Sequence, residues 1–254
     1  MRYRDEISVV AGPDRAVVSK RIGLRAMGQS KRIGFLFNHD QIHQIAHSLP
    51  IALALAAQGG PFEVIIASTN AKLREEIERL AGSLKGRITL VDLALTSPVS
   101  RSLVTVLGKL VPAYKILIYR DNLEFFRSLD ILVVSERTSL LLKSRYGLDR
   151  PLMILADHGA GDRAIGFGQK TAMFDHILAA GPKIRDRLVR DAGVDPARLT
   201  ITGYPKFDAC LGEGSPLPMQ SNGKPTVLYN PHVSPHLSSW FGMGARVLDH
   251  FLDS

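Results

Sequence analysis

The chain has 254 residues and is 45% hydrophobic, which suffices for one large domain or two smaller ones with a buried core. Its 32 Lys and Arg against 24 Asp and Glu give a net charge of +8. This excess favours an anionic partner, whether nucleotide, phosphorylated substrate, nucleic acid or acidic membrane surface, without choosing among them. The single cysteine, Cys210, excludes a disulfide framework and a cysteine-based zinc site within one chain, as is typical of a reducing cytoplasm.

The N-terminus is basic but lacks the continuous apolar core of a signal peptide. The longest run of small and apolar residues, 49–57, falls far short of the ~20 residues that span a bilayer. We therefore expect a soluble, cytoplasmic protein, or at most a peripheral one at the inner face of the membrane.

Residues 1–30 show no clear periodicity and are interpreted as an N-terminal extension. From residue 31 onward, short apolar runs alternate with helical patterns. Strands are expected at 32–37, 62–68, 87–93, 130–135, 151–156, 175–180 and 198–205, and helical segments at 41–60, 69–82, 99–128, 138–147 and 182–193. Pro50 either kinks or restarts the first helical segment. This alternation predicts an α/β domain at 31–210, a Rossmann-like parallel sheet with helices on both faces.

Residues 211–224 are rich in Gly, Pro, Ser and Asn, a composition typical of a linker. Beyond them, 226–231 has a strand pattern and 243–254 a helix pattern. One strand and one helix cannot bury a sheet face on their own. We therefore expect 225–254 to be the start of a second α/β domain that is truncated here.

Ligands of an open parallel sheet bind in the crevice at the carboxyl ends of the strands. Four expected strands end in candidate site residues: Asn38-His39, Ser135-Glu136, Asp157-His158-Gly159 and Ala180-Gly181. Because these ends should lie at one edge of the sheet, each candidate gains weight from the others.

His158 is the best single candidate for chemistry. An imidazole can take or give a proton near neutral pH, and glycines at 159 and 161 would let a substrate approach the backbone. The functional interpretation is a general base acting on an acceptor hydroxyl. The alternative is a histidine that ends a strand and hydrogen-bonds a loop.

His39, His43 and His47 are spaced to share one helix face, which makes a metal site conceivable. No HExxH arrangement accompanies them, and the third residue of a straight helix would lie two turns away. We favour His39, and with it His43, facing the crevice, with His47 packed or solvated, and we expect no metal and no cofactor.

Residues 99–120 combine apolar positions with basic ones, which fits either an anionic membrane surface or a core helix with a solvated face, the second being favoured. The sequence lacks GxxxxGK[ST] and has no GxGxxG after the first expected strand, which disfavours a P-loop NTPase and a dinucleotide-dependent dehydrogenase. Nucleic acid is also disfavoured, because the basic residues are scattered without interleaved aromatics.

Three segments carry a resemblance to a known family. Residues 157–163 (DHGAGDR) resemble the strand-end His-Gly of the CDP-glycerol glycerophosphotransferase family, whose members make polymers of the teichoic-acid type. Residues 177–208, with their Gly-Tyr-Pro and nearby Asp, resemble the family's next block, and 225–236 resemble the strand that opens its second domain. The layout is shared more loosely by other GT-B glycosyltransferases and by UDP-N-acetylglucosamine 2-epimerases.

The resemblance implies a transferase that moves a glycerophosphate or sugar from a nucleotide-activated donor, CDP-glycerol or a UDP-sugar, to a polyol or sugar acceptor, which can be lipid-linked. It implies that His158 is the base. The strand-end argument and the resemblance together predict these substrate-binding residues in the first domain: Asn38, His39, His43, Asp157, Gly159, Gly181 and Tyr204. The resemblance implies that Asn230, His232 and Ser234 lie at the donor phosphates.

The sequence departs from the family in two respects. Asn230-Pro231-His232 stands where the family usually has Ala-Pro-Thr, and most of the family's nucleotide-binding half would lie beyond residue 254. Two other functions stay open. A 2-epimerase would need cleft carboxylates, for which Asp157 and Glu136 are candidates. A non-catalytic module would hold an anionic polymer or a membrane surface.

Overall fold

The computed structural model describes residues 30–38, 42–107, 111–157, 166–209, 226–232 and 234–252. Contacts divide the chain between Leu211 and Gly212 into two compact units, each described here by itself. The expected extension at 1–30, except Ser30, and the expected linker at 211–224 lie outside the described residues.

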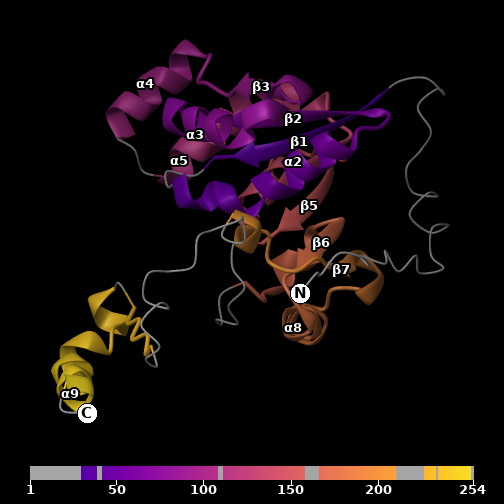
Figure 1. The fold of residues 1–254 in the computed structure, drawn as a ribbon. Helices are drawn as coiled ribbons and strands as arrows, with labels where there is room; N and C mark the ends of the chain where they lie inside the picture. The colour runs from indigo at the N-terminus through magenta and orange to yellow at the C-terminus, as the bar shows by residue number, and fades with distance from the viewer. Residues whose placement is uncertain are drawn as a thin grey trace. The chain divides into compact units, whose positions relative to one another are not determined.

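The first unit is built on a parallel sheet of seven strands, in the order β3-β2-β1-β4-β5-β6-β7 (Figure 1). Its strands are β1 (Lys31–Phe37), β2 (Phe62–Ser68), β3 (Thr89–Asp92), β4 (Ile131–Val134), β5 (Leu152–Ala156), β6 (His176–Ala179) and β7 (Leu199–Ile201). All six strand pairs are parallel. This confirms the predicted α/β class. The order reverses between β1 and β4, as in other doubly wound sheets.

The connections between strands are mostly helical. They are η1 (Ile42–His47), α2 (Leu49–Gln58), α3 (Ala71–Ala81), η2 (Gly82–Arg87), α4 (Pro98–Leu107), α5 (Val111–Asp121), α6 (Leu123–Arg127), η3 (Arg137–Leu140), α7 (Leu141–Ser144), η4 (Gln169–Met173), α8 (Pro182–Ala192), η5 (Pro196–Arg198) and η6 (Pro205–Ala209). Pro50 restarts the first helical segment, since it lies in the first turn of α2, where its missing N–H costs no hydrogen bond.

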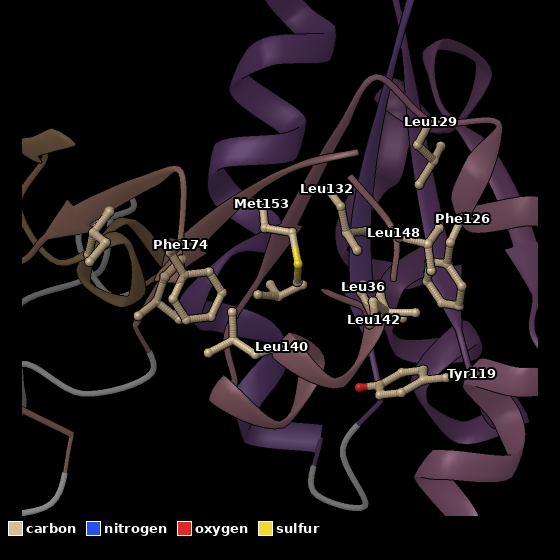
Figure 2. Close-up of a cluster of buried hydrophobic side chains, with 14 of the residues drawn as sticks. Leu36, Tyr119, Phe126, Leu129, Leu132, Leu140, Leu142, Leu148, Met153 and Phe174 are labelled. Atoms are coloured by element: carbon tan, nitrogen blue, oxygen red, sulfur yellow. The ribbon is translucent and has the colours of Figure 1, made fainter. Parts of the chain in front are cut away.

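The core lies on both faces of the sheet. On one face, Leu36, Leu132 and Met153 of the strands belong to one buried cluster with Tyr119 of α5 and Phe126 of α6 (Figure 2). On the other face, buried side chains of the strands pack against α2 and α3, among them Phe35, Phe37, Ile66, Ala52 and Ile77. Burial on both faces explains why the strands read as continuous apolar runs.

The last predicted strand of this unit is too long. β7 stops at Ile201 because Gly203 turns the chain with a positive φ of 78° and Pro205 begins η6. That early turn brings Tyr204 back toward the sheet edge.

The second unit contains η8 (Pro235–Leu237) and α9 (Trp240–Leu252). The strand predicted at 226–231 is wrong: these residues have no regular secondary structure, and Leu228 is 80% exposed. A strand pattern needs a partner strand, and the described part of this unit offers none. Helix α9 begins three residues before the predicted start, with the Trp240 ring stacked on Tyr229 at 6.1 Å. Among the described helices, none is long and apolar enough to cross a bilayer.

Candidate functional site

The strand ends singled out from the sequence lie at one edge of the sheet. Strands β1, β4, β5 and β6 are neighbours and parallel, so the residues that follow them leave the sheet on the same side. Asn38 follows β1, Ser135 follows β4, Asp157 follows β5 and Ala180 follows β6. This is the edge where open α/β sheets bind ligands.

A cleft lies at this edge beside the ends of β5, β6 and β7. The cleft is shallow and partly open to solvent, and its enclosed space is about that of one water molecule. Its lining comes from the start of α2 with the residue before it, and from the strand ends: His47, Ile51, Ala156, Asp157, Leu178, Ala180, Thr202, Gly203, Tyr204 and Pro205.

One wall of the cleft is a pair formed by His47 and Tyr204. The Tyr204 hydroxyl lies 3.1 Å from His47 Nδ1, and the ring centroids are 5.6 Å apart. His47 is only 4% exposed, and Tyr204 also makes an edge-to-face contact with Phe207 at 5.3 Å. The pair joins the segment after β1 to the segment after β7. Burial raises the pKa of Tyr204, and the negative charge of Asp157 raises it further.

Asp157 forms an ion pair with Arg137, a residue that does not itself line the cleft. The Arg137 Nη2 donates to Asp157 Oδ2 at 2.6 Å, and Nη1 lies 3.4 Å from Oδ1. The Arg137 Nε donates to the Thr171 hydroxyl at 3.1 Å, and that hydroxyl donates to the Gly166 carbonyl at 3.0 Å. Arg137 therefore ties the chain on both sides of residues 158–165 to the loop after β4.

Gly166, which has no side chain, leaves space for the guanidinium of Arg137. Its φ is +117°, and a Cβ there would lie 3.0 Å from Arg137 Nη2. The next residue, Phe167, is covered by the guanidinium of Arg187, 3.9 Å from the ring centroid. Such cation–π contacts stabilise a packed aromatic ring. Two arginines thus fix the start of the segment that leads to η4.

A buried polar network fills the edge between β1 and β4. The Asn38 amide donates to the Tyr119 hydroxyl at 2.6 Å, and that hydroxyl lies 3.2 Å from Ser139 Oγ. Burial raises the pKa of Tyr119 to about 12, against the opposing effect of its hydrogen bonds. Asn38 is only 5% exposed, so its amide serves this network rather than the surface of the cleft.

Glu136 is engaged by Lys115 of α5 in an ion pair and accepts a hydrogen bond from the Thr138 hydroxyl at 2.8 Å. Both carboxylates considered for an epimerase, Glu136 and Asp157, therefore carry a cationic partner. Only Asp157 of the two lines the cleft.

The structure brings together some of the predicted site residues. Asp157 and Tyr204 both line the cleft. Gly181 is the residue before α8, where Pro182 occupies the first turn. His158, Gly159 and His39 lie outside the described residues, as does the side chain of His43.

Asn230, His232 and Ser234 belong to the second unit, where the Ser234 N–H donates to His232 Nδ1 at 2.9 Å. Their role at a donor phosphate stays a prediction.

Sequence reasoning missed His47 as a cleft residue, because its packing against Tyr204 depends on a contact across 157 positions. It also missed Arg137, although this residue stands two positions after Ser135 and the strand-end argument could have included it. Within the described part of the chain, no group of three or more His, Cys, Asp or Glu could hold a metal ion.

No protein-family model and no curated protein matches the sequence. A protein described as a UDP-N-acetylglucosamine 2-epimerase from Listeria monocytogenes has a TM-score of 0.48 and 13% identity, over 77% of this chain and 52% of its own. The lipopolysaccharide outer core galactosyltransferase WaaB, in its apo form, has a TM-score of 0.41 and 10% identity, over 67% of this chain and 44% of its own. A glycosyltransferase from Rickettsia africae ESF-5 has a TM-score of 0.38 and 13% identity, over 68% of this chain and 43% of its own.

The chain spans about half of the length of these solved structures or less.

Proposed function

We propose that the chain belongs to a transferase that moves a glycerophosphate or a sugar from a nucleotide-activated donor to an acceptor hydroxyl, and that the first unit supplies the acceptor side. The observation that carries the proposal is the cleft at the carboxyl ends of β5 to β7. Asp157, which forms the polar wall of the cleft with His47 and Tyr204, immediately precedes His158 in the chain. The sequence resemblance of 157–163 and 177–208 to a transferase family supports the same assignment.

His158 is the proposed general base. It removes the proton from the acceptor hydroxyl as that oxygen attacks phosphorus in CDP-glycerol, or the anomeric carbon in a UDP-sugar. The bond to the nucleotide breaks, CMP or UDP leaves, and the proton on the imidazole passes to solvent. Asp157 and Tyr204 orient the acceptor hydroxyls, and His47 fixes the Tyr204 ring.

The donor phosphates are assigned to Asn230, His232 and Ser234 of the second unit. Backbone and side-chain dipoles can stabilise a leaving phosphate without a metal ion. This half of the proposal rests on the sequence resemblance of 225–236.

An epimerase is a weaker candidate. It needs a carboxylate or another base in position to remove a proton from the sugar. Glu136 does not line the cleft, and the carboxylate of Asp157 is engaged in an ion pair with Arg137.

The test uses the whole protein that contains this chain, with any residues that follow Ser254 included. It measures nucleotide release from CDP-glycerol and from UDP-N-acetylglucosamine, each with and without a glycerol-terminated or sugar acceptor. Release that requires the acceptor is expected. Acceptor-independent conversion of UDP-N-acetylglucosamine to its 2-epimer would establish the epimerase instead. No consumption of either donor, together with retained binding to anionic vesicles or polymer, would replace the transferase with a binding module.

A further inference from the structure

The side chain of Arg137 connects the two described stretches of chain that flank residues 158–165. On one side, its Nη2 donates to Asp157 Oδ2 at 2.6 Å, and its Nη1 lies 3.4 Å from Oδ1. On the other side, its Nε donates to the Thr171 hydroxyl at 3.1 Å, and that hydroxyl donates to the Gly166 carbonyl at 3.0 Å. The residue before 158–165 and the residue after it are therefore joined through one guanidinium.

The backbone that carries Arg137 is itself well anchored. Arg137 is the first residue of η3, and Ser139 and Leu140 of the same turn are buried. The preceding residue, Glu136, is paired with Lys115 of α5. A guanidinium is planar and carries its N–H donors in a rigid fork, so it can hold two acceptors in one relative orientation. Arg137 is thus suited to fix the positions of its two partners.

The chain is also packed on both sides of 158–165. Ala156, the last residue of β5, is buried, and so is Phe167, which belongs to the core cluster and is covered by the Arg187 guanidinium at 3.9 Å. A segment whose two ends are fixed has fewer conformations to lose than one fixed at a single end. The contacts of Arg137 add to this restriction directly at the two ends.

We propose that Arg137 is a positioning residue of the transferase: by joining Asp157 to Gly166 through Thr171, it fixes the backbone that carries His158 toward the acceptor hydroxyl. A trans peptide bond places neighbouring Cα atoms about 3.8 Å apart, so the orientation of Asp157 bears directly on where His158 begins. The inference rests on the proposed function and deepens it, since it assigns Arg137 a role in geometry beyond its charge.

Two other roles for Arg137 lead to different expectations. A role through charge alone requires the contact with Asp157 and not the contact with Thr171. A role in stability alone changes the fraction of folded molecules and leaves the turnover of each folded molecule unchanged. The variants are therefore chosen to break the two contacts separately, and they are compared under conditions in which all of them are folded.

The experiment uses the whole protein that contains this chain, with any residues that follow Ser254 included. It measures kcat and KM for acceptor-dependent nucleotide release, with CDP-glycerol or UDP-N-acetylglucosamine as the donor, at a temperature where circular dichroism shows every variant folded. Arg137→Ala should lower kcat by about 10–100-fold, because a small displacement of a reacting group can cost ~10²-fold. The KM for the donor should change by less than about twofold.

Two further variants distinguish geometry from charge. Thr171→Val removes the hydroxyl that links Arg137 to Gly166 and leaves the ion pair with Asp157 in place, so kcat should still fall by at least about threefold. Arg137→Lys keeps the charge but lacks the fork that reaches both acceptors, so its kcat should stay within about threefold of that of Arg137→Ala.

Matched controls come from the end of β2 and from α3. Arg74→Ala removes an arginine that also pairs with a carboxylate, that of Asp92 at 2.7 Å. Ser68→Ala removes a buried hydroxyl that donates to the same carboxylate at 3.2 Å. Both variants should keep the wild-type kcat.

Hydrogen exchange followed by mass spectrometry tests the contacts of Arg137 without turnover. Peptides that cover 157–174 should exchange at least about fivefold faster in Arg137→Ala than in the wild type, because local opening no longer breaks these bonds. The same peptides should exchange at the wild-type rate in Arg74→Ala.

A wild-type kcat in Arg137→Ala or in Thr171→Val would overturn the inference and leave the proposed transferase standing. Full recovery of kcat in Arg137→Lys would also overturn it and assign Arg137 a role through charge, and unchanged exchange of 157–174 in Arg137→Ala would overturn the joining of the two ends. A wild-type protein that releases no nucleotide from either donor would instead overturn the proposed function, and this inference with it. If Arg137→Ala does not fold, Thr171→Val decides.

Discussion

The Nη2 atom of Arg137 lies 2.6 Å from Oδ2 of Asp157, which joins the loop after β4 to the end of β5 at the edge of the cleft. Both side chains are about a quarter exposed, so the ion pair is partly buried. The second bond of Arg137, to Thr171, fixes the guanidinium in one orientation. The geometry of Asp157 therefore depends on a residue outside the cleft.

Loss of Arg137 should destabilise the fold. Arg137→Ala removes hydrogen bonds to a carboxylate and leaves the part-buried Asp157 without its cation, so we expect the free energy of unfolding to fall by roughly 1–3 kcal/mol. Arg137→Lys keeps the charge but lacks the planar fork that reaches two acceptors, and should give an intermediate value. Urea denaturation measures both.

The control for this prediction is Arg74→Ala. Arg74 pairs with Asp92 and with Glu78 at the protein surface, and the Asp92 side chain is 60% exposed, so the loss of Arg74 should cost less than the loss of Arg137. An equal loss in the two alanine variants would show that Arg137 has no special role.

Gly166→Ala should be destabilising because of its backbone conformation. At a φ of +117° an alanine is strained by about 1–3 kcal/mol, and its Cβ would crowd Arg137, which cannot move without loosening Asp157. Gly168→Ala is the matched control, since Gly168 has a φ of −79° and nothing within 4 Å of its Cβ position. That change should be neutral or stabilising by about 0.4–1 kcal/mol. Thermal melting of both variants distinguishes them.

The fold could be predicted from the sequence where the pattern is local. Alternating strand and helix patterns identified the seven strands, because each strand of a doubly wound sheet is a short apolar run buried on both faces. The prediction failed at 226–231, where the apolar run has no partner strand among the described residues. It also misplaced the end of β7, which depends on the turn at Gly203.

A pH-dependent contribution to stability is expected from Asp121. Its carboxylate caps α4, accepting from the Thr96 and Ser97 N–H groups at 3.0 and 2.9 Å and from the Ser100 hydroxyl at 2.8 Å. Burial alone would raise its pKa, but these bonds and Arg120 outweigh burial and hold the pKa below its ordinary value of 3.8.

Because the folded-state pKa is lowered, this contribution is present above the ordinary pKa and is lost as the pH falls through the folded-state value. Asp121→Asn should therefore reduce the free energy of unfolding by about 1 kcal/mol at neutral pH, and the difference from wild type should shrink in acid. Urea midpoints across the acid range measure it. Glu124→Gln, in an exposed pair with Arg127, should show little effect at any pH; if both variants respond alike, the cap is not the cause.

The candidate site was predictable only in outline. The strand-end rule placed Asp157 at the carboxyl edge of the sheet, and in the structure this residue lines the cleft; its role there stays a prediction. The rule could not predict which side chains these residues contact. Asn38 sits at the right edge but donates to Tyr119, and His47 reaches the cleft through Tyr204, a residue far along the chain. Such pairs arise from packing between loops, which periodicity does not encode.

The most direct test of the transferase proposal is the rate of acceptor-dependent nucleotide release by His158→Ala at saturating donor and acceptor. A general base typically contributes 10²–10⁴-fold, so the rate should fall by about that factor while the melting temperature stays unchanged. His176→Ala is the control, because His176 is the first residue of β6 and lies at the amino end of this strand, opposite to the carboxyl ends that border the cleft. The rate of this variant should match that of the wild type. A wild-type rate in His158→Ala would contradict the account.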